Sequence, residues 1–363
     1  MVQREHMPPF RVQTAQCAYD AVVKRGCLKR VHEFIPPHSG KLFVVTTEDV
    51  WRLHGAPLAK ALDTHAYQIL FFQGSEVNKR LTPVETLADQ MVDSGADRTS
   101  VIIGFGGGIV TDIAGFLAAI FMRGIPVLQI PTTLLAQVDA SIGGKTGVNL
   151  RSGKNLIGSF HQPLVVLIDP DVLSTLPGRE FRAGLFEVIK CGVIRDPHLF
   201  ALLENRADAV LANESGVVEE LIFAAVRIKA EVVSADERES DLRRILNFGH
   251  TIGHAIESET EYVRFLHGEA IAWGMLAATR LAELRGMLPV DEAIRIKKVI
   301  CRYGPLPPAN DLNPDRLIAR FTSDKKTLQG KVHFILPVTI GEVKIVTGID
   351  SAVIRQAITD SLQ

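Results

Sequence analysis

Residues 41–168 alternate between short apolar runs and longer segments with helical periodicity. Runs this rich in Val, Ile, Leu and Phe indicate strands of a parallel sheet that helices cover on both faces. The predicted strands are residues 41–45, 67–72, 100–104, 126–130 and 164–168, and the first two helices between them are residues 50–62 and 83–92. We therefore predict a Rossmann-like α/β domain over residues 1–177.

The pattern changes after residue 173, where a helical period of 3.6 residues dominates. The chain length of 363 residues fits two domains. The change to helical periodicity therefore predicts a separate, mostly α-helical domain over residues 178–363. The predicted helices are residues 181–193, 217–234, 242–258 and 269–285, and a hairpin is predicted from residues 332–336 and 343–346.

Charge and composition exclude several classes of protein. A net charge of −1 argues against an extended nucleic-acid surface. The four cysteines are scattered and have no metal-binding spacing, which indicates free thiols in a reducing compartment. The N-terminus has no signal-peptide pattern, and the longest apolar stretch, residues 113–122, is too short to cross a bilayer. We expect a cytoplasmic protein with no membrane or nucleic-acid partner.

Three of the eleven histidines lie between residues 247 and 267. His250 and His254 are four residues apart in a helical pattern, so their imidazoles share one face. His267 follows a short polar loop, residues 257–262, that suits a turn back of the next helix. Converging imidazoles can bind a divalent metal such as zinc. The alternative is a histidine pair that only makes surface hydrogen bonds; the third histidine and acidic segments upstream favour the metal.

A glycine-rich turn, residues 104–112, joins a predicted strand to a helix. Glycines let backbone amides approach a phosphate, and a helix N-terminus favours negative charge, so the turn indicates a nucleotide site. It is not the Gly-x-Gly-x-x-Gly fingerprint, it follows the third strand rather than the first, and tight turns need glycine in any case. Thr132 and Thr133 end the next strand, at an edge where α/β sheets bind ligands.

Several charged residues suit an anionic substrate. Lys145, Lys154 and Asn155 are predicted to lie in glycine-rich loops, where they either bind a phosphate or carboxylate or are simply solvated. Glu187 and Lys190 share an apolar helical face, as an ion pair or as a metal-binding carboxylate beside a cation. Lys229 lies in an apolar helical segment, where a lysine often has no role beyond extending its ammonium group to solvent. A four-residue spacing predicts one helical stripe that runs into the histidines: Glu239, Arg243 and Asn247.

These segments together resemble the 3-dehydroquinate synthase family, in order and with few gaps over residues 40–350. In the first half the resemblance rests on Gly106-Gly-Gly-Ile-Val-Thr-Asp-Ile-Ala-Gly-Phe116, Met122-Arg-Gly124, Pro131-Thr-Thr-Leu-Leu-Ala-Gln-Val-Asp139, Gly143-Gly-Lys-Thr-Gly147 and Gly153-Lys-Asn-Leu-Ile-Gly158. In the second half it rests on Glu187-Val-Ile-Lys190, Leu246-Asn-Phe-Gly-His250, Gly253-His-Ala-Ile-Glu257, Leu266-His-Gly-Glu-Ala270 and Asp324-Lys-Lys326.

The resemblance implies a cytoplasmic lyase of the shikimate pathway, which leads to chorismate and the aromatic amino acids. Its cofactors would be NAD and a divalent metal, zinc or cobalt, and the enzyme would be a homodimer. Its small-molecule substrate would be 3-deoxy-D-arabino-heptulosonate 7-phosphate, converted to 3-dehydroquinate and phosphate. The family's reaction proceeds by transient oxidation with NAD, phosphate β-elimination, re-reduction, ring opening and an intramolecular aldol addition.

The resemblance also implies roles for individual residues. The implied metal ligands are Glu187, His250 and His267. The implied cofactor contacts are Glu76, Lys79, Gly106, Gly107, Gly108, Asp112, Thr132, Thr133, Lys145, Lys154 and Thr175. The implied substrate contacts are Asp139, Lys145, Asn155 and Lys326, with Arg123 reaching in from the partner subunit. The implied catalytic residues are Lys190, Lys229, Glu239, Arg243, Asn247 and His254, among which Glu239 would orient the cations.

Three positions depart from the family pattern. Thr47 stands where an acidic residue often binds the adenosine ribose, and Thr111 replaces a usual glycine in the nucleotide turn. The loop before His267 lacks the common Gly-Tyr-Gly. We expect these changes to affect cofactor affinity and not the reaction.

Two other enzymes fit part of the pattern. A related sugar-phosphate cyclase that makes a valiolone, a deoxy-inosose or an amino analogue would share the metal ligands and the nucleotide turn. The pair Lys229 and Arg243 instead favours a carboxylate-bearing substrate. A metal-dependent alcohol or glycerol dehydrogenase shares the two-domain plan without needing the phosphate-binding lysines. A non-catalytic scaffold leaves the glutamate–histidine set unexplained.

Overall fold

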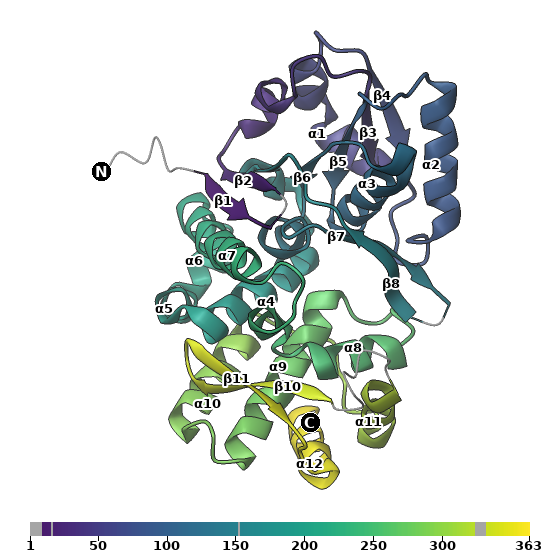
Figure 1. Cartoon of the computed structure of the whole chain (residues 1–363). Helices are drawn as coiled ribbons and strands as arrows, with labels where there is room; N and C mark the ends of the chain where they lie inside the picture. The colour runs from purple at the N-terminus through teal and green to yellow at the C-terminus, as the bar shows by residue number, and fades with distance from the viewer. Residues whose placement is uncertain (1–8, 16, 152, 324–331) are drawn as a thin grey trace. The chain divides into compact units, whose positions relative to one another are not determined.

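The computed structural model describes residues 9–15, 17–151, 153–323 and 332–363. The chain folds into two compact units, Met1–Pro177 with Lys229–Arg238, and Gly178–Ile228 with Glu239–Gln363 (Figure 1). Helix α7 (Ser215–Ala235) contributes to both units, because Lys229 lies inside it. Among the helices of the described residues, none is long and apolar enough to cross a membrane.

The first unit is built on a seven-stranded sheet with the order β1-β2-β9-β6-β5-β3-β4. Strands β1 and β2 pair antiparallel, and every other pair of neighbours is parallel. The prediction of five parallel strands is confirmed to within two residues; the β1–β2 hairpin was not predicted. The strands are β1 (Phe10–Gln13), β2 (Ala18–Val23), β3 (Leu42–Thr46), β4 (Tyr67–Phe71), β5 (Val101–Gly106), β6 (Val127–Pro131) and β9 (Val165–Ile168).

Helices cover both faces of this sheet, as its apolar strands require. In β3, Phe43 and Val45 pack with α2 and α3, whereas Leu42 and Val44 pack with η1 and α1 on the other face. The helical segments of this unit, apart from the end of α7, are η1 (Cys27–Phe34), α1 (Glu48–Ala61), α2 (Leu81–Asp93), α3 (Gly108–Ile120), η2 (Phe121–Arg123), the π-helical turn η3 (Ala136–Ala140) and η4 (Pro170–Thr175).

The glycine-rich segment after residue 140 is a β-hairpin, so its interpretation as loops is wrong. Strand β7 (Lys145–Leu150) pairs antiparallel with β8 (Gly153–Phe160). Gly147 and Gly158 lie opposite each other, and a Cβ on Gly158 would come within 2.2 Å of the carbonyl oxygen of Thr146. The glycines therefore permit the two strands to pair closely. In the sequence, a segment with this many glycines has the composition of a loop.

The second unit is mostly helical, as predicted. The helical segments are α4 (Gly178–Arg195), α5 (Pro197–Asn205), α6 (Ala207–Leu211), the first part of α7, η5 (Leu242–Asn247), α8 (His250–Glu259), α9 (His267–Leu284), α10 (Val290–Arg302), α11 (Pro314–Ser323) and α12 (Ser351–Ser361). The predicted hairpin is present as β10 (His333–Thr339) and β11 (Glu342–Thr347).

The single helix predicted over residues 242–258 is wrong, because the chain breaks at Gly249. Helix η5 ends at Asn247, with Phe248 as its C-cap, and Gly249 has φ 81°, a left-handed conformation directly before α8. A Cβ at Gly249 would also come within 2.9 Å of the carbonyl oxygen of Ile271, so α8 and α9 pack closely at this point. The break separates the turn that carries Asn247 from the helix that carries His250.

Candidate functional site

The second unit brings together a carboxylate and two imidazoles from three helices. Glu187 lies on α4, His250 begins α8 and His267 begins α9. The Nε2 atoms of His250 and His267 lie 3.7 Å and 3.6 Å from Oε1 of Glu187. The Glu187 side chain is only 1% exposed, and its Oε1 accepts no hydrogen bond within the part of the chain that the structure describes. A buried carboxylate oxygen without a hydrogen-bond donor is a favourable place for a cation to bind.

The hydrogen bonds of the two imidazoles direct their Nε2 lone pairs towards Glu187. Nδ1 of His250 lies 3.1 Å from the carbonyl oxygen of Phe248, and Nδ1 of His267 lies 3.3 Å from Oε2 of Glu257. A carbonyl oxygen and an ionised carboxylate can both accept a hydrogen bond but cannot donate one. Each Nδ1 atom therefore carries the proton. In its neutral form, each imidazole then offers Nε2 as a metal ligand.

These three side chains fit a divalent metal. Metal–ligand distances of about 2.1 Å in a tetrahedral site place neighbouring ligand atoms about 3.4 Å apart. The separations of 3.7 Å and 3.6 Å are close to that spacing. Burial lowers the pKa of His250 well below its usual value, and the nearby Lys190 lowers it further, so this imidazole is neutral and able to bind a metal.

His254 gives a second possible ligand set. The ligand atoms of His250, His254 and His267 all lie within 4.8 Å of one another. The prediction that His250 and His254 share a helical face is confirmed, with ring centroids 5.3 Å apart. Glu187 nevertheless accounts better for the site, because its unpaired buried oxygen needs a cation whereas His254 is only partly buried.

Lys190 forms an ion pair with Oε2 of Glu187, and its side chain is also 1% exposed. The predicted i, i+3 pair on α4 is therefore present and fully buried. It uses one carboxylate oxygen and leaves the other directed at the histidines. Lys190 thus holds the carboxylate in place and brings a second positive charge beside the imidazoles.

The three polar residues before His250 do not form the predicted helical stripe. Glu239 lies in a turn with φ 60°, while Arg243 and Asn247 lie on η5. Glu239 still reaches Asn247, whose Nδ2 donates to Oε1 of Glu239, and Arg243 is almost completely buried. The left-handed conformation at Glu239, and not a continuous helix, places its carboxylate beside Asn247.

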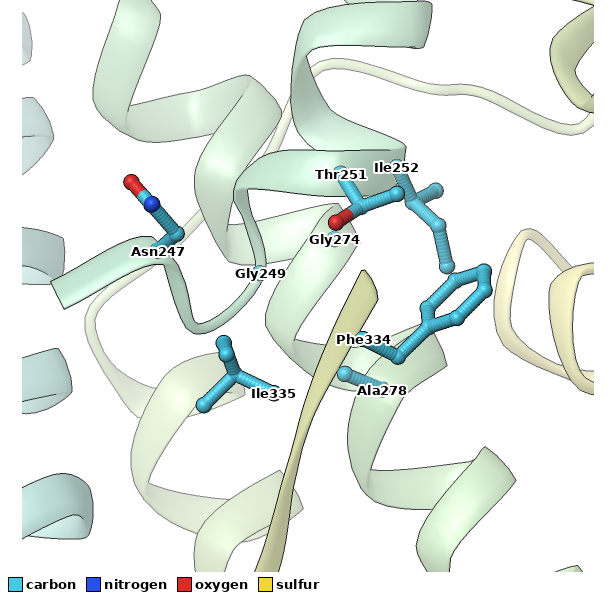
Figure 2. Close-up of a pocket in the computed structure, with 8 residues that line it drawn as sticks. All are labelled: Asn247, Gly249, Thr251, Ile252, Gly274, Ala278, Phe334 and Ile335. Carbon is cyan, nitrogen blue, oxygen red and sulfur yellow. The ribbon is translucent and has the colours of Figure 1, made fainter. Parts of the chain in front are cut away.

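A small pocket lies beside this turn. Figure 2 shows Asn247 and Gly249 near Thr251 and the strand that carries Phe334 and Ile335. The hydroxyl of Thr251 donates to the carbonyl oxygen of His333 at 3.0 Å, and much of the remaining lining is apolar. We interpret this pocket as a packing gap and not as a ligand site.

The glycine-rich turn in the first unit has the predicted strand–turn–helix form. Gly106 ends β5, Gly107 precedes α3 and Gly108 begins it. A Cβ on Gly107 would lie 3.0 Å from Cγ2 of Thr133, so the turn packs closely against the segment after β6. The hydroxyl of Thr111 donates to the carbonyl of Gly108 at 3.0 Å, so this departure from glycine is accommodated inside the helix.

A second cluster in the first unit contains five predicted ligand-binding residues. Nζ of Lys79 contacts the carboxylate of Asp112 and lies 2.6 Å from Oδ1 of Asn155. Burial raises the pKa of Asp112, and the charge of Lys79 opposes that effect. Nζ of Lys154 lies 3.4 Å from Oε1 of Glu76. These contacts tie the hairpin β7–β8 to residues that the family resemblance assigns to the cofactor.

Asn149 links these residues and was missed in the sequence. Its Nδ2 donates to Oε1 of Glu76 at 2.7 Å, and its Oδ1 accepts from the backbone amide of Asn155 at 2.9 Å. An asparagine inside an apparent loop gives no sign of such a role. Glu257 was also missed as a site residue, because its contact with His267 runs from α8 to α9 and spacing along one helix does not report it.

Three more predicted residues of the first unit each contact another side chain. Lys229 is buried and its Nζ lies 2.5 Å from Oδ1 of Asp139, so its head group does not simply reach water. Asp139 lies in the π-helical turn η3, a rare conformation that is frequent at functional sites. Thr175 bonds Nε2 of His54 at 2.7 Å.

The sequence also singles out five further positions. Thr132 is buried after β6, and its amide donates to the carbonyl of Gly106 at 2.9 Å. Lys145 begins β7, and Arg123 lies in an exposed left-handed turn after α3. Thr47 precedes α1 and its hydroxyl bonds Asp49. Lys326 lies outside the described residues.

Comparisons with known proteins agree with this geometry. Models of the 3-dehydroquinate synthase N-terminal and C-terminal domains match residues 69–183 and 184–327. A 3-dehydroquinate synthase from Solibacter usitatus is 58% identical over 98% of this chain and 100% of its own length. Two solved structures are also similar. A 2-epi-5-epi-valiolone synthase from Streptomyces hygroscopicus, solved with NAD+ and Zn2+, is 31% identical with a TM-score of 0.87, over 95% of this chain and 97% of that one. A 2-deoxy-scyllo-inosose synthase solved with NAD+ and Co2+ is 27% identical with a TM-score of 0.88, over 98% and 100%.

An α/β unit with a glycine-rich strand-to-helix turn, and a helical unit with a glutamate–histidine cluster, place the fold among the sugar-phosphate cyclases. The two domain models, which together match residues 69–327, identify the family within that class of enzymes. The chain belongs to the 3-dehydroquinate synthase family.

Proposed function

We propose that this chain converts 3-deoxy-D-arabino-heptulosonate 7-phosphate into 3-dehydroquinate and phosphate. The observation that carries the proposal is the unpaired, buried Oε1 of Glu187 facing two Nε2 lone pairs, in a chain of this family. When bound, NAD would accept a hydride from a substrate hydroxyl and return it later, while a divalent metal would lower the pKa of that hydroxyl.

In the helical unit, Glu187, His250 and His267 would hold the metal, zinc or cobalt. Lys190 would fix the carboxylate through its ion pair. His254 would face the substrate, because it lies beside the two histidine ligands and is partly exposed. Proton transfer during phosphate elimination would involve this imidazole or the departing phosphate itself.

In the α/β unit, the amides of the turn Gly106 to Gly108 would bind the diphosphate of NAD at the N-terminus of α3. Asp112, Lys79 and Glu76 would hold the rest of the cofactor, with Thr132, Thr133, Lys154 and Thr175. The bonds among Lys79, Asp112 and Asn155 support this role, because they hold these side chains in position before a ligand arrives.

The substrate would be recognised through its two anionic groups. Lys229 and Arg243 are both buried, so a carboxylate that reached either would gain a strong charge-assisted hydrogen bond. The phosphate and hydroxyl groups would be bound by Asp139, Lys145, Asn155, Asn247 and Lys326. Glu239, which accepts a hydrogen bond from Asn247, would orient the cations. We further propose a cytoplasmic homodimer in which Arg123 of one protomer reaches the substrate of the other.

The experiment that tests this function compares two sugar phosphates. The purified protein, with NAD and zinc, is supplied with either 3-deoxy-D-arabino-heptulosonate 7-phosphate or sedoheptulose 7-phosphate, and phosphate release is measured. We expect turnover of the first substrate alone, because the second has no carboxylate. Turnover of sedoheptulose 7-phosphate alone would assign the chain to the neighbouring cyclases.

A matched variant checks the reason for this selectivity. Lys229→Met removes the buried ammonium and keeps most of the side-chain volume. We expect a large loss of kcat/KM with the carboxylate-bearing substrate. An unchanged kcat/KM would contradict the proposed role of Lys229 in recognition.

A further inference from the structure

The two histidines of the metal cluster are held in different ways. Nδ1 of His250 bonds a backbone carbonyl, that of Phe248, and the His250 side chain is 11% exposed. Nδ1 of His267 bonds a side chain, that of Glu257, and the His267 side chain is 30% exposed. The orientation of His250 is therefore fixed by main chain and burial, whereas that of His267 depends on a residue that can be replaced.

Glu257 is well placed to control His267. Its carboxylate is almost completely buried, on α8, and its Oε2 lies 3.3 Å from Nδ1 of His267. A carboxylate that accepts from Nδ1 fixes the tautomer with Nε2 unprotonated and increases the electron density of the ring. Both effects strengthen Nε2 as a ligand, and Nε2 is the atom that lies 3.6 Å from Oε1 of Glu187.

We propose that Glu257 is a positioning residue that sets the metal affinity of the site through His267. The inference rests on the proposed metal site and deepens it. It assigns no contact between Glu257 and the metal or the substrate. The negative charge of Glu257 is essential to the role, since it is the charge that makes the hydrogen bond to Nδ1 strong.

The test measures zinc affinity directly, by competition with a chromophoric chelator at fixed pH. Glu257→Gln keeps the shape of the side chain and removes its charge. We expect a 10- to 100-fold weaker zinc affinity, on the order of other changes to residues that support a metal ligand. Zinc affinity within about threefold of the wild type, in a folded Gln variant, would overturn the proposal.

A carboxylate two residues further along α8 provides a matched control. Glu259 is also well buried, with a side chain 7% exposed, but it forms ion pairs with Arg316 and Arg320 instead of contacting a histidine. Glu259→Gln therefore removes the same charge from the same helix. It should lower thermal stability and leave zinc affinity unchanged. An equal loss of zinc affinity in both variants would mean that Glu257 acts only through the stability of α8.

A double-mutant cycle identifies the route of the effect. If Glu257 acts through His267, then Glu257→Gln should cause no further loss of zinc affinity in a His267→Ala background. An additive loss would overturn the assignment. Glu257→Asp retains the charge but shortens the side chain, so it too should weaken zinc binding, and it replaces the Gln variant if that protein does not fold.

The outcomes separate this inference from the proposed function. If the wild type binds zinc and turns over the sugar phosphate while Glu257→Gln has wild-type zinc affinity, only the inference fails. If the wild type binds zinc through His267 without turning over that substrate, the proposed function fails and the role of Glu257 stands. A wild type with no zinc affinity would overturn both.

Discussion

At the scale of single residues, the most informative observation concerns the two oxygens of Glu187. Oε2 pairs with Lys190, and Oε1 faces two imidazole nitrogens without a hydrogen bond from the described residues. An ion pair alone explains one oxygen only. The second oxygen gains a partner when a cation binds between it and the two histidines.

Replacing Glu187 should therefore have two separable effects. Glu187→Gln should weaken zinc affinity by more than about 100-fold, since changes outside the ligand set already cost 10- to 100-fold. It should also destabilise the metal-free protein by about 3–5 kcal/mol, because Lys190 stays buried without its anion. Chelator competition and thermal unfolding measure the two effects. Glu180→Gln, on the same helix, is the control, and an unchanged zinc affinity for Glu187→Gln would contradict the ligand assignment.

The buried imidazole of His250 predicts how stability depends on pH. Burial lowers its pKa in the folded protein well below the usual value of 6.5, so the unfolded chain binds more protons between those two values. The free energy of unfolding of the metal-free protein should therefore fall as the pH drops below 6.5. Denaturant titrations of the wild type and of His250→Gln test this, and the variant should show a shallower fall.

A control histidine separates this effect from general acid denaturation. His198 is exposed on α5, and His198→Gln should keep the pH dependence of the wild type. If His250→Gln and the wild type lose stability in parallel below pH 6.5, buried His250 is not the origin of the dependence.

At the scale of elements, glycines set the distance between the helices that carry Glu187, His250 and His267. A Cβ on Gly268 would come within 1.9 Å of the carbonyl oxygen of Ala183 on α4, and a Cβ on Gly274 within 1.9 Å of that of Gly249. Helix α9 therefore packs against α4 and α8 at backbone contact. This close packing brings His267 within reach of Glu187.

Gly268→Ala should consequently damage both stability and metal binding. The added methyl group forces α9 away from α4, and His267 precedes the substituted residue directly. We expect a lower melting temperature and a weaker zinc affinity, measured on the same preparation. Gly216→Ala on α7 meets no described atom within 4 Å, and should raise stability by up to about 1 kcal/mol with unchanged zinc affinity.

The sequence predicted the elements best where periodicity was strong. The five parallel strands and helices such as α4 and α9 are apolar enough to define themselves. It failed where one residue decides the conformation. Gly249 breaks a helix that the periodicity continues, and Gly147 with Gly158 forms a strand pair that looks like a loop. Short-range patterns do not report such contacts, because the partners come from elsewhere in the chain.

At the scale of the whole molecule, the sequence identified the candidate ligand residues more readily than the residues that contact and orient them. The resemblance to a family supplied Glu187, His250 and His267, and the structure brings these three together. The residues that hold them could not be read from spacing. Glu257 reaches His267 across two helices, and Asn149 joins Glu76 to Asn155 across a hairpin. Such supporting contacts depend on tertiary packing.

In the proposed reaction, NAD acts catalytically and turnover depends on the metal. The direct measurement is the number of phosphate ions released from 3-deoxy-D-arabino-heptulosonate 7-phosphate per NAD supplied, with absorbance at 340 nm followed in parallel. We predict many phosphates per NAD with no net accumulation of NADH, loss of release with a chelator, and recovery with zinc. One NADH formed per substrate consumed, or phosphate release that is indifferent to the chelator, would contradict the account.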